Sequence, residues 1–189
     1  MVDARILNTA AALNAAVISL AAETPISRIS VADVTRAVEI NRATFYSHPT
    51  SPSALLAQVL TRDLEQIRVT DNEERALGAR EPSDITRQSV VNSVRHVNRF
   101  REIYRLALTD ASDGTTHHVL SAQFYGSCLT HLRDSVPAGR IPGDIELVAA
   151  YVANGIVGTI EAAVASDSWD EDGLTELLMA MLPAWWDRA

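Results

Sequence analysis

The sequence contains no lysine, so all 16 of its strongly basic residues are arginines. Its single cysteine, Cys128, excludes an intramolecular disulfide and is expected to fill a helical core. No apolar run approaches the roughly 18 residues that span a membrane. Asp3 also stands where a signal peptide carries positive charge. These absences predict a cytoplasmic globular protein.

Enzymatic motifs are missing as well. The sequence has no Gly-rich phosphate loop, no Gly-x-Ser-x-Gly elbow, no His-Glu-x-x-His and no paired cysteines. His117 and His118 are consecutive, and consecutive side chains on a helix diverge by about 100°, so they rarely share a metal. We therefore expect no enzyme activity, no cofactor and no metal site.

No stretch alternates apolar and polar residues over more than a few positions, which argues against a sheet. Helical periodicity recurs along the whole chain instead, and it predicts an all-α fold. A polar segment with Gly78 and Pro82, about residues 70–84, is interpreted as a domain boundary. The longer predicted helices cover about residues 4–22, 51–69, 83–97 with a continuation to 108, 115–136, 144–166 and 170–188.

Residues 30–60 hold most of the functional information. Ser30 is a plausible helix N-cap, with Asp33 three residues later at the positive end of the helix. After a turn at residues 39–41, Asn41 can cap a second short helix that carries Arg, Thr, Tyr and His side chains. Two short helices joined by a tight turn, the second of them polar, are typical of a helix-turn-helix that reads DNA.

The block Thr44-Phe45-Tyr46-Ser47-His48, followed by Leu55-Leu56, resembles the TetR family of bacterial one-component transcriptional regulators. The resemblance covers about residues 4–65, and beyond it only the helical layout and the length agree. The chain departs from the family pattern at Glu39, where the family prefers glycine, at Pro49, where it has phenylalanine, and at Pro52, where a lysine usually meets a phosphate.

The resemblance implies an N-terminal three-helix unit, residues 1–50, that binds DNA. It also implies a C-terminal helical bundle, residues 51–189, for effector binding and dimerisation, with the helix of about 51–69 as the link. Thr44 is expected near base edges, and Tyr46, His48 and Ser30 are expected at phosphates. The full set of predicted DNA-binding residues is Ser30, Asn41, Arg42, Ala43, Thr44, Tyr46 and His48.

Charge leaves an alternative open. Residues 1–68 hold six arginines and six acidic residues, which cancel, so the remainder carries the whole net charge of −8. An acidic body repels DNA, and only the neutral N-terminal segment can approach it. Such a segment predicts modest affinity with few phosphate contacts. The alternative is a helical ligand-binding or adaptor protein whose DNA-binding module is degenerate.

The resemblance places an effector site in the middle helices, where apolar walls and a few polar groups occur together as in small-molecule pockets. The predicted lining residues are Phe100, Tyr104, Phe124, Cys128 and His131. Their few charges suggest a mostly apolar effector. The alternative is that these side chains simply fill the core of a helical bundle. Taken together, the function predicted is a repressor that a small molecule releases from its operator.

The segment of about 144–187 looks like an assembly surface. One predicted helix has small residues on one face, including Gly155 and Gly158, and the last helix has an apolar stripe from Leu174 to Trp185. In the TetR family this pair of helices packs against its two-fold mate. We therefore expect a homodimer on a palindromic operator, because two reading helices one helical turn apart match such a site. The alternative is that both stripes are buried within one subunit.

Overall fold

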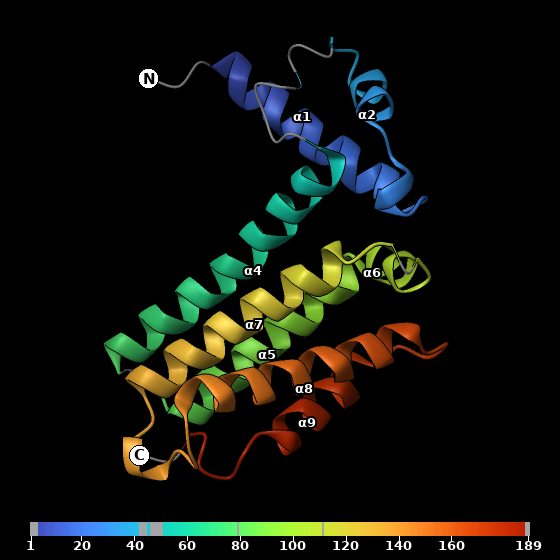
Figure 1. The fold of residues 1–189 in the computed structure, drawn as a ribbon. Coiled ribbons are helices and arrows are strands. Elements are labelled where there is room, and N and C mark those ends of the chain that lie inside the picture. The colour runs from blue at the N-terminus through green and yellow to red at the C-terminus, as the bar shows by residue number, and fades with distance from the viewer. Residues whose placement is uncertain (1–3, 42–44, 46–50, 79, 111, 188–189) are drawn as a thin grey trace. The chain divides into compact units, whose positions relative to one another are not determined.

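The structure is a computed structural model that describes residues 4–41, 45, 51–78, 80–110 and 112–187 (Figure 1). Its described part holds eight α-helices and no strand, which confirms the predicted all-α fold. In chain order the elements are α1 Ala4–Ala21, a 3-10 turn Ile26–Arg28, α2 Val31–Ala37, α4 Pro52–Leu77, α5 Pro82–Arg99, α6 Arg101–Leu108, α7 Thr115–Asp134, a 3-10 turn Ala138–Arg140, α8 Ile145–Ala165 and α9 Glu171–Met181.

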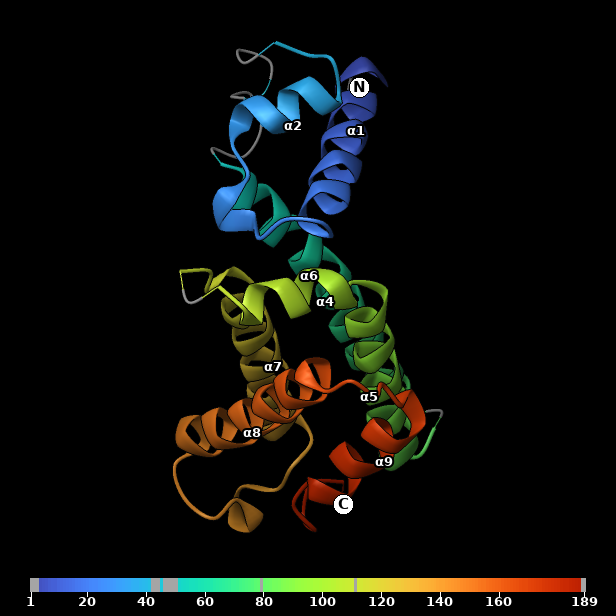
Figure 2. The ribbon, with the colours of Figure 1, turned by 90° about the vertical axis from the view of Figure 1, so that its right-hand side faces the viewer.

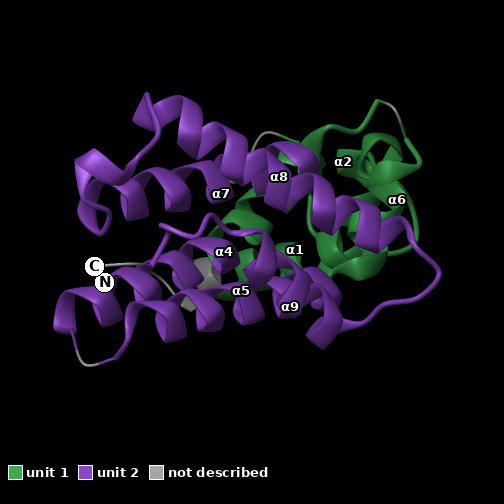
Figure 3. Ribbon diagram, turned by 90° about the horizontal axis from the view of Figure 1, so that it is seen from below, with its two compact units in different colours: residues 1–62, 100–116 green, residues 63–99, 117–189 purple. Residues whose placement is uncertain are grey.

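The chain divides into two compact units (Figure 3). The N-terminal unit contains residues 1–62 and 100–116, and the C-terminal unit contains residues 63–99 and 117–189. The predicted division lies between residues 50 and 51, whereas here residues 51–62 also belong to the N-terminal unit. Residues 100–116 join it as well, where α6 packs on α1. The Ser27 hydroxyl also donates to Asp110 just after α6, at 2.6 Å. That hydroxyl and two groups of Ser112 lower the pKa of Asp110 to about 2.

α2 begins and ends as its sequence dictates. The Ser30 hydroxyl oxygen accepts the Asp33 N–H at 3.2 Å, and the Asp33 carboxylate accepts the Ser30 N–H at 2.9 Å, which together form a capping box. At the other end the Ile40 N–H reaches the Thr35 carbonyl at 3.1 Å, the long bond of a Schellman motif. Such a motif needs a left-handed residue, and Glu39 supplies it with φ of 55°.

Glu39→Gly should stabilise the N-terminal unit by about 1 kcal/mol, because a side chain in the left-handed region carries a steric penalty that glycine avoids. The unfolding midpoint of the full chain in urea, followed by helical content, measures the gain. Glu39→Ala is the matched control, since it removes the same charge but keeps a Cβ. An equal gain from both variants would assign the effect to charge and contradict the backbone explanation.

The core of the N-terminal unit is apolar and fully closed around Phe45, which has no exposed surface. Leu13 and Val17 of α1 and Val34 of α2 are equally buried. α1 and α2 lie side by side in both views (Figures 1 and 2). Other buried members of the unit are Ile26, Leu55, Leu56, Leu60, Phe100, Ile103 and Tyr104.

α4 is longer than predicted, and the expectation that residues 70–84 form a boundary is wrong for most of that segment. The helix continues to Leu77 because its polar residues pair along the helix. The Arg75 guanidinium meets Asp71 one turn earlier at 3.3 Å, and the Thr70 hydroxyl donates to the Gln66 carbonyl at 3.0 Å. Gly78, with φ of 60°, ends the helix.

The C-terminal unit buries a cluster formed mainly by α7 and α8. Its buried members are Cys128, Leu132, Val136, Ala149, Val152, Ala153 and Trp186. α9 packs against both α5 and α8. It ends at Met181 rather than at the predicted residue 188, and Pro183 follows the C-cap residue Leu182.

α8 is the most apolar of the long helices in the described part of the chain. Its 21 residues have a mean hydropathy of 1.6 in an 18-residue window, so by length and composition alone the helix could cross a membrane. Glu146 and Glu161 interrupt the apolar run, which is why it is not evident residue by residue. Only 33% of the window is buried inside the subunit.

Candidate effector cavity and DNA-reading segment

Most of the predicted DNA-binding residues, namely Arg42, Ala43, Thr44, Tyr46 and His48, lie outside the described residues. Asn41 is exposed, and its carbonyl accepts the Phe45 N–H at 3.4 Å, the spacing of a first helical turn. Ser30 is also exposed, but its hydroxyl donates to the Asp33 carboxylate at 2.6 Å. A phosphate bound at Ser30 would have to replace that carboxylate.

The C-terminal unit contains a cavity bounded by α4, α5, α7, α8 and the C-terminal segment. About 80 Å³ of it is open to the centre of a water-sized sphere. One water needs about 10–15 Å³ by this measure, so the space exceeds a single water several-fold. The apolar part of the wall is formed by Leu64, Ile67, Val90, Phe124, Cys128, Ile156, Leu182 and Trp186.

The structure brings three of the five predicted effector residues to this cavity: Phe124, Cys128 and His131. It places the other two elsewhere, since Phe100 and Tyr104 are buried in the N-terminal unit. The physical reason is the break between α5 and α6. α5 ends at Arg99, Phe100 is the N-cap residue of α6, and α6 packs on α1.

One end of the cavity wall is polar, and its central group is Arg75 of α4. The Arg75 guanidinium donates to the Thr86 hydroxyl at 2.7 Å and to the Asp71 carboxylate at 3.3 Å. The Thr86 hydroxyl in turn donates to Asp187 at 2.7 Å. Because one arginine faces two carboxylates, this end of the wall does not present a net positive charge.

His131 lies beside this polar group. Its Nε2 is 3.0 Å from the carbonyl oxygen of Trp186, and its ring stacks on the Trp186 ring with centroids 4.5 Å apart. Burial lowers the pKa of His131, because the charged imidazolium loses its hydration. Burial also raises the pKa of the neighbouring Cys128 thiol to about 12, so Cys128 is an apolar wall residue and not a nucleophile at neutral pH.

Comparison with known proteins bears on the fold. No family model matches the sequence, and no curated protein is similar to it in sequence. Solved structures do match. A TetR transcriptional regulator from Streptococcus agalactiae is 18% identical, with a TM-score of 0.63 over 94% of this chain and 95% of that one. The chain has the fold of TetR-type transcriptional regulators.

Other structures of this fold agree. The fatty acid degradation regulator FadR from Bacillus halodurans is 14% identical, with a TM-score of 0.64 over 92% of this chain and 95% of that one. RolR in complex with resorcinol is 19% identical, with a TM-score of 0.57 over 94% of this chain and 88% of that one. The predicted resemblance to the TetR fold is thereby confirmed.

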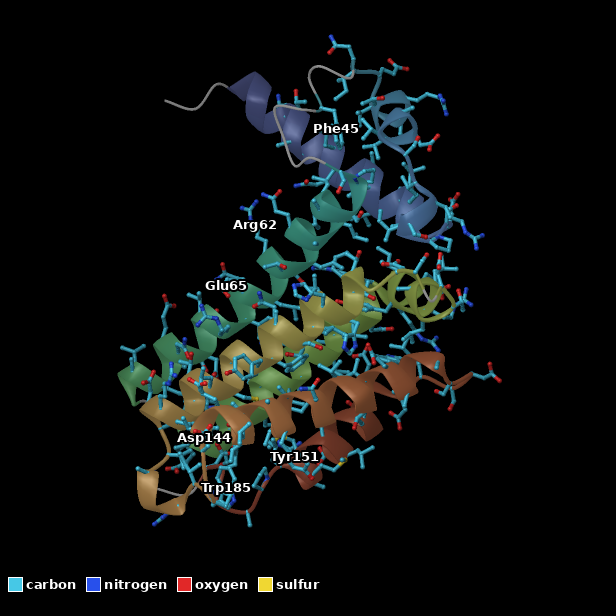
Figure 4. The ribbon with its side chains drawn as sticks, in the orientation of Figure 1. Phe45, Arg62, Glu65, Asp144, Tyr151 and Trp185 are labelled. Carbon is cyan, nitrogen blue, oxygen red and sulfur yellow. The ribbon has the colours of Figure 1, made fainter. Side chains whose placement is uncertain are left out.

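The TetR-type fold of this chain leaves an apolar face uncovered on α8 and α9, which lie side by side (Figures 1 and 2). The exposed fraction is 81% for Tyr151 and 72% for Leu147 on α8. It is 59% for Met181 and 49% for Leu177 on α9. Tyr151 can be followed in Figure 4. Leu178, in contrast, is buried within the subunit.

Gly155 and Gly158 lie on the same exposed face of α8. A Cβ added at either position would meet no described atom within 4 Å. Glycine inside a helix costs about 1 kcal/mol relative to alanine. Among the described residues, no close contact requires a glycine at either position.

A chain of three polar side chains occurs on the surface of α7 and α8. The His117 Nδ1 is 2.8 Å from Glu161, and the Ser121 hydroxyl is 3.3 Å from the His117 Nε2. The order is that of a hydrolytic triad. However, the His117 side chain is 56% exposed and none of the three residues lines the cavity described above. We interpret the group as a surface interaction between two helices.

Proposed function

We propose that this chain is a DNA-binding transcriptional regulator that acts in the cytoplasm, most simply as a repressor that a small molecule releases from its operator. The observation that carries the proposal is the cavity with its mixed apolar and polar wall inside a TetR-type fold. RolR, which shares the fold, is known in complex with resorcinol. The proposed DNA-reading residues are those inferred from the resemblance: Ser30, Asn41, Arg42, Ala43, Thr44, Tyr46 and His48.

α4 supports a coupling between ligand and DNA. Its first residues, up to Arg62, belong to the N-terminal unit, and its later residues Leu64, Ile67, Arg68, Asp71 and Arg75 line the cavity. A ligand that fits one position of α4 better than another shifts the population of both units. By reciprocity, DNA then weakens ligand binding by the same factor.

The proposed assembly is a two-fold dimer through α8 and α9, within residues 144–187. An exposed apolar face on a subunit of this size marks an interaction surface. Glycines without a reason inside the subunit allow close approach of a second helix. A copy of the same chain provides the complementary face, because a two-fold interface pairs each patch with itself. A two-fold dimer also suits a palindromic operator.

A gel-shift assay with DNA flanking the coding region tests the proposal. Thr44→Ala should reduce the preference for the operator over unrelated DNA, because a base contact contributes about 1–3 kcal/mol of discrimination. Tyr46→Phe should weaken binding to all sequences alike, because a phosphate contact carries no sequence information. If the unaltered chain shifts no DNA at low salt, the chain is instead a ligand-binding or adaptor protein with a degenerate DNA-binding module.

A further inference from the structure

The protonation of His131 follows from its hydrogen bond. A carbonyl oxygen only accepts, so the Nε2 that faces the Trp186 carbonyl at 3.0 Å carries the proton. Burial keeps the ring neutral by lowering its pKa. In a neutral imidazole with a protonated Nε2, the other nitrogen, Nδ1, is a bare acceptor.

That acceptor has no partner. The Nδ1 of His131 is buried and forms no hydrogen bond with the described residues, and the residue as a whole is 6% exposed in the cavity wall. Leaving a buried polar atom unsatisfied costs about 1–3 kcal/mol. A ligand group that donates a hydrogen bond here would recover that cost.

The neighbouring Arg75 has a buried donor that lacks an acceptor. Thr86 and Asp71 occupy two sides of its guanidinium, but Nη1 has no hydrogen-bond partner among the described residues. The Asp187 carboxylate is 4.0 Å from this nitrogen, which is too far for a hydrogen bond. Nη1 is therefore a donor that requires an acceptor. A hydroxyl group can donate to one atom and accept from another, whereas an ammonium only donates and a carboxylate only accepts.

Charge argues against an anionic ligand. Asp71 and Asp187 already offset Arg75, and the only other arginine in the wall, Arg68, is paired with Glu65. An anion would be attracted only weakly by Arg75, whose charge is already offset. It would also be repelled by the Nδ1 lone pair and by the two carboxylates. The cavity measure of about 80 Å³ corresponds to roughly five to eight water-sized groups, which is the scale of a single ring.

From these observations we propose that the cavity selects small, neutral, hydroxyl-bearing molecules with an apolar body, and that His131 Nδ1 accepts the hydroxyl hydrogen. The assignment of this ligand as the effector rests on the proposed function. Both polar atoms are buried although their residues line the cavity, so binding requires small side-chain shifts, as is common at interfaces.

The test uses four probes of nearly equal size: benzyl alcohol, toluene, benzoate and benzylammonium. Their affinities for the full chain are measured by NMR titration. Benzyl alcohol should bind more tightly than either charged probe. His131→Phe is the decisive variant, because a phenyl ring can still stack on Trp186 but offers no acceptor. Toluene binding by this variant shows that the cavity is retained. The preference for benzyl alcohol over toluene should fall by roughly 2- to 12-fold, the value of one neutral hydrogen bond.

The matched control is His117→Phe, at an exposed histidine of the same helix, which should leave the preference unchanged. Nitrogen NMR of His131 adds a readout that a merely structural role would not move. Benzyl alcohol should shift the signal of the bare Nδ1 while Nε2 stays protonated. Tighter binding of either charged probe, no binding of any probe at millimolar concentration, or an unchanged preference in His131→Phe would overturn the proposal.

DNA release is measured separately by gel shift. Benzyl alcohol that binds through His131 without releasing DNA supports the ligand class and overturns only the proposed regulation. DNA binding that persists when no probe enters the cavity supports a DNA-binding protein and overturns the ligand class.

Discussion

A Tyr151→Asp chain should run as a monomer with its helical content intact, whereas the unaltered chain should run as a dimer. Tyr151 is 81% exposed within one subunit, so a charge there stays in contact with water in the folded monomer. In the proposed dimer the same charge is buried against the apolar face of the second copy, and burying an unpaired charge is strongly unfavourable. Light scattering at micromolar concentration measures the difference.

The monomer should also lose operator affinity by about 10²- to 10⁴-fold, because two linked DNA-binding units bind more tightly than one by that factor. Ala122→Asp is the matched control, since it adds the same charge at an exposed position of α7. Leu178→Asp shows the different behaviour of a buried site and should lower stability directly. An unaltered chain that is monomeric, or a Tyr151→Asp chain that stays dimeric, would assign the apolar face to another partner.

Phe45→Ala should destabilise the N-terminal unit by about 3–5 kcal/mol, the cost of truncating a fully buried phenylalanine. Phe45 has no exposed surface, and its place in the N-terminal unit is marked in Figure 4. Hydrogen exchange of the α1 and α2 amides measures the effect locally, because a chain of two units need not unfold in one step. The C-terminal helices should keep their protection.

Phe45→Leu retains most of the buried volume and should cost much less. Thr44→Ala, at the neighbouring position, should leave exchange unchanged and affect DNA binding alone. Normal protection of α1 and α2 in Phe45→Ala would show that the N-terminal core does not depend on this ring. Loss of DNA binding in Phe45→Ala would by itself report on folding and not on recognition.

Local signals in the sequence were sufficient to predict where several helices begin. Ser30 with Asp33 predicts the start of α2, and Asp144 and Asp170 accept N–H groups at the starts of α8 and α9. These contacts span two or three residues, so pattern and capping chemistry determine them. The same holds for the TetR-like block around Phe45, whose burial agrees with its expected place in the three-helix core.

Where the sequence pattern gave a wrong prediction, an interaction between residues farther apart in the chain determined the structure. α4 continues past residue 69 because Arg75 pairs with Asp71 and also reaches Thr86 on α5. Phe100 and Tyr104 belong to the N-terminal unit because α6 packs on α1. Aromatic content alone could not distinguish a cavity wall from a buried core, since both need apolar side chains.

The sequence by itself therefore determined the all-α fold, the starts of the capped helices and the resemblance to the TetR fold, since each depends on residues close together in the chain. Only the tertiary structure decided which polar groups share the cavity wall. Thr86 meets Asp187 across 101 positions, and His131 meets Trp186 across 55. No periodicity encodes such pairs, because they depend on how helices pack. The tautomer of His131, and hence the kind of ligand it selects, follows from that packing.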